Sequence, residues 1–236
     1  MKLLMVAGPP SAGKTTVIKQ VVKNLGSRFK IAFLKIDVVT AFEDEELKME
    51  FGIDTMKVYS GDLCPDHAGV MVLGDAIDWG ERVGAQLLIV ESAGLCLRCS
   101  PYLNQGLGVV VLDAISGIHA PLKMGPMVSL ADTAVVTKID LVSQAEREVF
   151  RQKIREVHPD VKIIETNALQ GNSLQWFYKI IEDSKPINKD NLILKGVPPI
   201  GTCTICIGKK NVGWQHHFGI IKRLDANCSE YLYRGE

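Results

Sequence analysis

The chain has 236 residues, of which 47% are hydrophobic, and it carries 27 basic and 27 acidic side chains. This length suits one α/β domain with a small appendage, and the balanced charge gives no field that would favour nucleic acid or an acidic membrane surface. No apolar run reaches the roughly 18 residues of a membrane-spanning helix. The N-terminus does not read as a signal peptide, so we expect a cytoplasmic protein that binds neither membrane nor nucleic acid. Six cysteines in such a protein favour metal or redox chemistry over structural disulfides.

Apolar runs alternate with helical patterns over the first 184 residues, which predicts an α/β domain with a mostly parallel sheet covered on both faces. The expected strands are residues 3–7, 30–36, 56–59, 87–90, 108–112, 133–136 and 161–164. The expected helices are residues 14–25, 43–51, 67–79, 144–157 and 173–182.

The turn after the first strand reads Gly8-Pro9-Pro10-Ser11-Ala12-Gly13-Lys14-Thr15 and matches the phosphate-binding pattern G-x-x-x-x-G-K-[ST] between a strand and a helix. This context predicts a P-loop NTPase three-layer fold, the alternative being a glycine-rich turn without a ligand. Lys14 would reach the β- and γ-phosphates, and the Thr15 hydroxyl would bind Mg²⁺. The residues expected to cradle the phosphates are Gly8, Ser11, Ala12, Gly13, Lys14, Thr15 and Thr16.

Two acids follow other strands and are candidates for the Mg²⁺ environment. Asp37 ends the second strand, where it could bind Mg²⁺, position a water molecule or simply cap a loop. Glu91 ends the fourth strand and precedes Gly94, whose N–H could contact the γ-phosphate.

Residues Thr137, Lys138, Ile139 and Asp140 end another buried strand and resemble the guanine motif of GTPases, although a strand end with a helix cap is the alternative. The Asp140 carboxylate could accept hydrogen bonds from guanine N1–H and N2–H₂, whereas adenine would leave it unpaired. The Lys138 stem could cover the base. After the next strand, Asn167, Ala168 and Leu169 look like the last base-contacting loop of GTPases.

Together these motifs resemble the metallochaperone GTPases of the SIMIBI class, among them the hydrogenase nickel-incorporation (HypB) family and the urease accessory GTPases. The resemblance covers residues 1–184 and leaves 185–236 unexplained. It implies slow GTP hydrolysis with Mg²⁺, a nucleotide-dependent homodimer, and delivery of nickel or a similar metal to a client metalloenzyme. In this interpretation Lys14, Asp37 and Glu91 are the catalytic residues, and Thr15, Asp37 and Glu91 surround Mg²⁺.

Two cysteine motifs flank the phosphate-side elements. Hydrogenase-type members carry a Cys-His pair and a further Cys, and this chain has Cys64-x-x-His67 and Cys96-x-x-Cys99 at altered spacing. Thiolate and imidazole ligands suit Zn²⁺, Ni²⁺ or an iron–sulfur centre, held within one chain or shared across a dimer. The structural alternatives are a half-buried turn for the first motif and an apolar loop for the second.

Residues 185–236 begin with a polar linker and form a segment too short for its own core, so it would dock on the main domain or be held by a metal. Cys203 and Cys206 resemble a metal knuckle that His216, His217 or Cys228 could complete. A hairpin with buried cysteines and a surface histidine pair are the alternatives. Short strands are expected within 218–224 and 231–233.

Two further functions remain open at this point. One is a nucleotide-dependent activator of an iron–sulfur or corrinoid enzyme, with the cysteines holding a cluster. The other is a nucleotide-switched binding module with negligible turnover, whose cysteines are structural zinc ligands.

Overall fold

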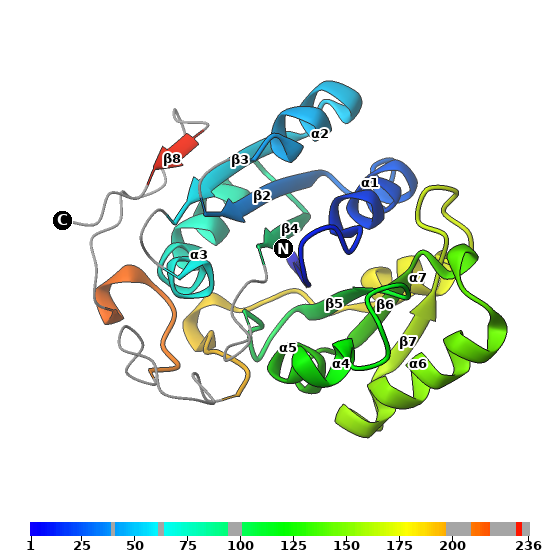
Figure 1. The fold of residues 1–236 in the computed structure, drawn as a ribbon. Helices are drawn as coiled ribbons and strands as arrows, with labels where there is room; N and C mark the ends of the chain where they lie inside the picture. The colour runs from blue at the N-terminus through cyan, green and yellow to red at the C-terminus, as the bar shows by residue number, and fades with distance from the viewer. Residues whose placement is uncertain (39–40, 61–63, 94–100, 197–208, 218–229, 233–236) are drawn as a thin grey trace.

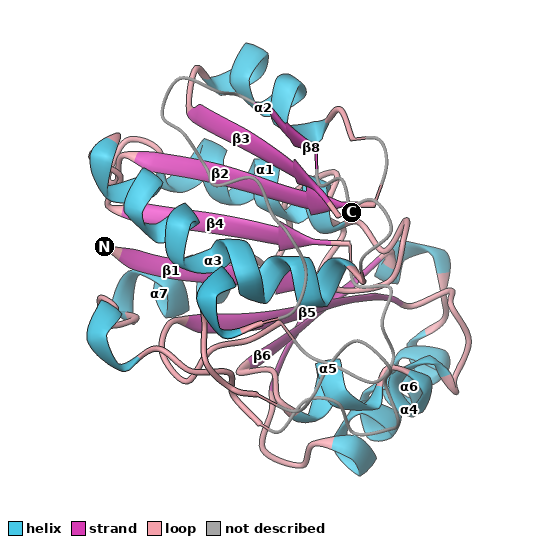
Figure 2. Cartoon of the chain, turned by 90° about the vertical axis from the view of Figure 1, so that its left-hand side faces the viewer, coloured by secondary structure: helices cyan, strands magenta, loops and turns pink. Residues whose placement is uncertain are grey.

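The structure, a computed structural model, describes residues 1–38, 41–60, 64–93, 101–196 and 209–217, and the backbone of residues 230–232. Its strands form one parallel sheet in the order β7-β6-β5-β1-β4-β2-β3-β8 (Figures 1 and 2). The strands are β1 (Lys2–Ala7), β2 (Ile31–Asp37), β3 (Asp54–Tyr59), β4 (Leu87–Ser92), β5 (Leu107–Asp113), β6 (Thr133–Thr137), β7 (Lys162–Glu165) and β8 (Glu230–Leu232). The predicted α/β fold with a parallel sheet is confirmed.

Helices cover both faces of the sheet, which explains why the strands read as continuous apolar runs. The helices are α1 (Lys14–Leu25), α2 (Glu43–Phe51), α3 (Pro65–Arg82), α4 (Ala120–Lys123), α5 (Gly125–Ser129), α6 (Gln144–Val157) and α7 (Gln175–Asp183). One core cluster packs α3, α5 and α6 on one face of the sheet, and a second packs α1, α2 and α7 on the other. Both layers therefore rest on the central strand β1, which leads directly into the predicted phosphate loop.

Two short helices were not predicted, and two predicted helices, α3 and α7, have other bounds in the structure. Helices α4 and α5 carry Pro121 and Pro126 in their first turns, where proline is tolerated but gives no periodic signal. Helix α3 begins at Pro65 for the same reason, two residues before the expected start. Helix α7 begins later than expected because Ser173 has a φ of 64°, which a right-handed helix cannot contain.

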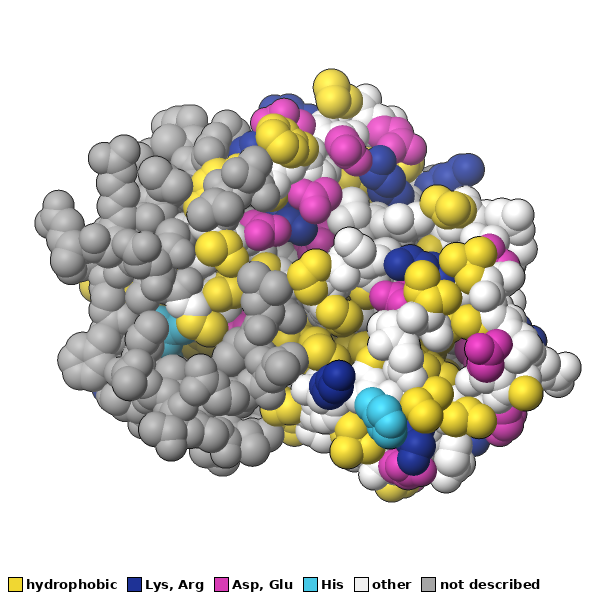
Figure 3. All heavy atoms as spheres, viewed as in Figure 1, with side chains coloured by type: hydrophobic (Ala, Val, Ile, Leu, Met, Phe, Trp, Pro, Cys, Tyr) yellow, Lys and Arg dark blue, Asp and Glu magenta, His cyan; other side chains and the backbone are white. Residues whose placement is uncertain are grey.

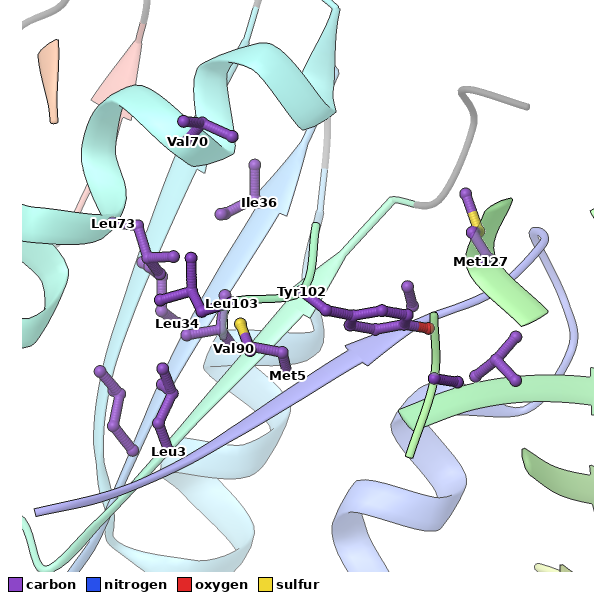
Figure 4. Close-up of a cluster of buried hydrophobic side chains, with 14 of the residues drawn as sticks. Leu3, Met5, Leu34, Ile36, Val70, Leu73, Val90, Tyr102, Leu103 and Met127 are labelled. Atoms are coloured by element: carbon purple, nitrogen blue, oxygen red, sulfur yellow. The ribbon is translucent and has the colours of Figure 1, made fainter. Parts of the chain in front are cut away.

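The C-terminal segment is docked on the main domain wherever the structure describes its side chains. The N–H of Ile187 donates to the Met1 carbonyl over 3.0 Å, and that of Lys195 donates to the Tyr102 carbonyl over 2.8 Å. Tyr102 and Leu103 enter the core beside Met5 (Figure 4), and Leu194 is only 3% exposed within the same cluster. Docking, one of the two expected alternatives, is thus observed for these residues.

The last described strand, β8, extends the sheet beyond β3. It pairs in parallel with β3, with Tyr231 opposite Val58. The strand expected at 231–233 is therefore found at Glu230–Leu232, while the one expected at 218–224 lies outside the described residues. Two short 3₁₀ turns, η2 (Lys189–Asn191) and η3 (Trp214–His216), complete the described segment.

Candidate nucleotide site and the adjacent cysteine–histidine motif

The loop between β1 and α1 has the backbone geometry of a phosphate cradle. Gly8, Ser11 and Gly13 have φ angles of 152°, 60° and 90°. At Gly8 a Cβ atom would lie 2.2 Å from the Val111 carbonyl oxygen, so this position requires glycine. Gly13 precedes α1 and offers no side chain to cap it, which leaves the first N–H groups of the helix available to an anion.

Lys14 is folded over this loop. Its ammonium donates to the carbonyls of Gly8 and Pro9 over 3.0 and 3.1 Å, and its side chain is buried. Burial lowers the pKa of Lys14, although Glu91 opposes this shift. A triphosphate in the loop would offer the ammonium charged oxygens in place of neutral carbonyls, and charge-assisted hydrogen bonds are the stronger kind.

A cluster of charged side chains lies beside the loop, at the carboxyl ends of β2 and β4. The Thr15 hydroxyl donates to the Glu91 carboxylate over 3.1 Å. The Lys35 ammonium lies 2.8 Å from Glu91, 3.1 Å from Glu43 and 3.4 Å from Asp37. Burial would lower the pKa of Lys35, but Glu91 and Glu43 outweigh it and hold that pKa well above its usual value, so the ammonium stays charged.

These groups line one cleft of about 440 Å³ that joins the phosphate loop to the acids. Thr15, Asp37 and Glu91 supply the hard oxygen donors that Mg²⁺ prefers, so the residues fit that ion. The structure thus brings together the predicted residues Ser11, Gly13, Lys14, Thr15, Thr16, Asp37 and Glu91. Gly94 lies outside the described residues.

Sequence reasoning missed Lys35 and Glu43. A signal for Lys35 was present, because a lysine inside the apolar strand β2 stands two residues before Asp37 and therefore on the same face of the sheet. In the sheet register Lys35 lies opposite Glu91. Glu43 is the first of four consecutive acids at the start of α2, and no motif distinguishes it from the other three.

The predicted guanine motif lies at the same edge of the sheet, after β6. The Thr137 hydroxyl is buried and donates to the Ala12 carbonyl over 2.6 Å, so this side chain holds the phosphate loop. Lys138 has a φ of 55°, and its ammonium lies 3.7 Å from Asp113, a buried acid at the end of β5 that sequence reasoning also missed. Asp140 is exposed in the 3₁₀ turn η1 (Ile139–Leu141).

The second predicted base loop lies next to the first. The Thr166 N–H donates to the Val136 carbonyl over 2.8 Å, which joins the ends of β6 and β7. The Asn167 side-chain oxygen accepts hydrogen bonds from the N–H groups of Leu169 and Gln170. The carbonyls of Ala168 and Leu169 accept from Gln20 of α1, so both base loops are anchored to the elements that carry the phosphate loop.

The first cysteine motif lies at the beginning of α3. Cys64 is the N-cap residue, and the buried His67 packs edge-to-face against His217 with ring centroids 5.2 Å apart. His217 is therefore not an isolated surface residue. Burial lowers its pKa, while its hydrogen bond to Asn211 opposes the shift.

Asp66, between these two residues, is connected to the end of β4. Its carboxylate is 3% exposed and accepts a hydrogen bond from the Ser92 hydroxyl over 3.1 Å. Cys96, Cys99, Cys203, Cys206 and Cys228 lie outside the described residues. Among the residues that the structure describes, no three His, Cys, Asp or Glu side chains are grouped as a metal site.

A comparison with protein families matches residues 2–165 to the family described as CobW/HypB/UreG, nucleotide-binding domain. The chain belongs to this family. The match spans every element from β1 to β7 that carries the phosphate and base loops. The resemblance inferred from the motifs is thereby confirmed.

Several individual proteins of the CobW/HypB/UreG family are similar to this chain. MJ0120 of Methanocaldococcus jannaschii, described as uncharacterized, is 40% identical over the full length of both chains. HypB of Azotobacter chroococcum is 26% identical over 74% of this chain and 57% of its own length. UreG 1 of Saccharopolyspora erythraea is 32% identical over 60% of each chain. This chain thus spans between 57% and 60% of the length of the last two relatives.

Solved structures show the same fold. HypB from Archaeoglobus fulgidus has a TM-score of 0.63 at 22% identity, covering 77% of this chain and 89% of that one. HypB from Helicobacter pylori, solved in complex with nickel, has a TM-score of 0.62 at 19% identity, covering 80% and 91%. In the part of the chain that the structure describes, no helix is long and apolar enough to cross a bilayer.

Proposed function

We propose that this chain is a GTP-hydrolysing metallochaperone, which uses its nucleotide state to control a transition-metal cargo for a client metalloenzyme. The family, the phosphate loop and the base loops support the nucleotide part of this proposal. The HypB and UreG relatives, and the nickel complex of Helicobacter pylori HypB, favour nickel as the cargo.

The observation that carries the proposal is a direct connection between the phosphate cleft and the cysteine–histidine motif. Glu91 and Ser92 are consecutive residues of β4, so their side chains point to opposite faces of the sheet. Glu91 accepts from Thr15 and Lys35 in the cleft, while Ser92 donates to Asp66, the neighbour of His67. A shift of the β4 end on nucleotide binding would therefore move residues on both sides.

The residues of the cleft have distinct roles in this proposal. Lys14 neutralises the β- and γ-phosphates, and Thr15, Asp37 and Glu91 hold Mg²⁺, which supplies charge stabilisation at the transferred phosphoryl group. Asp37, 25% exposed at the cleft rim, orients the attacking water. A nucleotide-dependent homodimer places two such sites together.

The base specificity is tested by Asp140→Asn. In the unaltered protein GTP should bind far more tightly than ATP, because the Asp140 carboxylate accepts from two guanine donors. Loss of these bonds should weaken GTP binding roughly tenfold to a few hundredfold, since hydrogen bonds to charged groups contribute about 1.5–3 kcal/mol. Binding of xanthosine triphosphate should strengthen, because the asparagine amide can donate to its O2.

Fluorescent-nucleotide titration measures these affinities, and Asp160→Asn, an exposed aspartate beyond α6, is the matched control. Equal affinity of the unaltered protein for ATP and GTP would overturn the guanine assignment.

The coupling is tested by Ni²⁺ titration of the reduced protein with GDP or a non-hydrolysable GTP analogue. The Ni²⁺ affinity should differ about 5- to 150-fold between the two states, and Ni²⁺ should change the analogue's affinity by the same factor, since coupling is reciprocal. Ser92→Ala removes the bond to Asp66 and should reduce this factor toward one while nucleotide still binds. Identical Ni²⁺ affinity in both states would contradict the metallochaperone function. A brown protein that contains iron would instead indicate an iron–sulfur cluster.

A further inference from the structure

Two buried lysines lie side by side on the face of the sheet that α2 covers. Lys35 of β2 is opposite Lys57 of β3 in the sheet register, and the two residues are 2% and 5% exposed. The first turn of α2 supplies an acid to each, because Lys35 lies 3.1 Å from Glu43 and Lys57 lies 2.8 Å from Glu45. Lys35 is among the described residues that line the phosphate cleft, whereas Lys57 is not.

The ammonium of Lys35 is surrounded by carboxylates. It lies 2.8 Å from Glu91, 3.1 Å from Glu43 and 3.4 Å from Asp37. An ammonium has three donors, so a phosphate oxygen could bind Lys35 only by displacing one of these acids. Lys14 differs, because it donates to two neutral carbonyls that a charged phosphate can replace. Lys35 is therefore a partner of the acids rather than a second phosphate-binding lysine.

The position of Lys35 limits what the acids can bind. Asp37 and Glu91 are the two carboxylates expected around Mg²⁺, and the ammonium already lies within 3.4 Å of both. In the described part of the chain, these acids do not form a group of three that could hold a metal ion. A divalent ion that entered the cleft alone would lie close to a fixed positive charge, and such charges repel strongly where water is partly excluded.

We propose that Lys35 is a resident cation that excludes free divalent ions from the cleft, so that Mg²⁺ enters only together with a nucleotide. The phosphates change the balance, because they supply negative oxygens to the ion while Lys14 and the phosphate loop hold them. In a protein that carries a transition-metal cargo, the same exclusion keeps free cargo ions out of the hydrolytic cleft. This inference rests on the proposed function in placing Mg²⁺ beside Asp37 and Glu91.

The test is titration of the full chain with Mn²⁺, an ion that takes the same oxygen ligands as Mg²⁺. The electron paramagnetic resonance signal of aqueous Mn²⁺ loses intensity on binding and reports the affinity. Without nucleotide, Lys35→Met should bind Mn²⁺ at least about tenfold more tightly than the unaltered protein, because one nearby positive charge is gone. An Mn²⁺ affinity that does not rise would overturn the proposal.

The same variant should bind fluorescent GTP more weakly in the presence of a chelator, because the cleft has become more negative. These opposite shifts separate the loss of a charge from a loss of structure, which would weaken both ligands. Lys57→Met is the matched control, since it removes a buried lysine that pairs with Asp44 and Glu45 outside the cleft lining. It should leave both affinities unchanged, and equal shifts in the two variants would contradict a specific role of Lys35.

Two further measurements locate the effect and do not depend on one variant. Adding Glu91→Gln to Lys35→Met should abolish the gained Mn²⁺ binding, and a gain that persists would place the ion outside the cleft and overturn the proposal. The unaltered protein should bind Mn²⁺ about 5- to 150-fold more tightly with GDP than without it. Equal affinities would show that free ions are not excluded. Because the titrations without nucleotide need no GTP binding, they can fail separately from the proposed function.

Discussion

Lys35 is a buried cation among three carboxylates of the cleft. It is 2% exposed and lies within 3.4 Å of Glu91, Glu43 and Asp37. A buried ion pair is tolerated only while its members compensate each other, so removing the ammonium leaves an unpaired charge at Glu91. Lys35 therefore prearranges the acids before any metal or nucleotide arrives.

We expect Lys35→Met to lower the free energy of unfolding by about 3–5 kcal/mol, the usual effect of removing one member of a buried pair. Urea unfolding measures this loss, and adding Glu91→Gln should recover part of it. The control is Lys19→Met, because Lys19 pairs with Glu46 and Glu50 at 29% exposure and should contribute under about 1 kcal/mol. Equal losses for Lys35→Met and Lys19→Met would contradict a compensating role.

The sequence alone identified residues that belong to a motif of fixed spacing, such as Lys14 and Thr15. It missed Lys35 and Asp113, because each is a single charge in an apolar strand whose partner comes from another element. Glu91 lies opposite Lys35 in the sheet register, and Lys138 lies beside Asp113.

At the scale of elements, β6 holds the phosphate loop in position. The buried Thr137 hydroxyl donates to the Ala12 carbonyl, and a Cβ atom built on Gly13 would lie 3.4 Å from the Thr137 methyl group. The element that carries the base motif therefore also fixes the loop that faces the phosphates. The helix after β6 is predictable from local sequence, because α6 begins with a capping box formed by Ser143 and Glu146.

Thr137→Val keeps the shape of the side chain and removes its hydroxyl. It should weaken GTP and GDP by a similar factor of about ten, because a buried carbonyl that loses its donor costs roughly 1–3 kcal/mol. The preference for guanine over adenine should persist, unlike in Asp140→Asn. Thr137→Ser should restore both affinities. A loss of base preference in Thr137→Val would show that this side chain acts on the base directly.

At the scale of the molecule, the described surface carries mixed charge, and the C-terminal segment packs on the main domain. Acidic and basic side chains are interspersed on the face shown in Figure 3, in keeping with their equal numbers in the sequence. Residues 193–195 of the C-terminal segment pair with residues 102–104 of the main domain and with residues 210–211 of the segment itself. These partners lie in loops, so the sequence shows no periodic pattern that would predict the contacts.

Leu194→Ala should lower the free energy of unfolding by about 2–4 kcal/mol, because this side chain is almost fully buried in the main core. Ile193→Ala is the matched control, since the neighbouring side chain is 40% exposed and should cost well under half as much. Thermal or urea unfolding of the full chain measures both. Equal effects would mean that the segment contributes little to the stability of the domain.

The pairing of β8 with β3 has a consequence for how the protein is made. Lys57 and Glu230 are neighbours in the sheet, although the ribosome synthesises Glu230 long after Lys57. Strand β3 is therefore an unpaired edge of the sheet until β8 has been synthesised. Unpaired edge strands can pair with other extended chains. Closing so long a loop is also slow. Nascent chains should therefore be most prone to aggregation after β7 emerges and before β8 does, a window in which a chaperone that shields sheet edges would raise the yield.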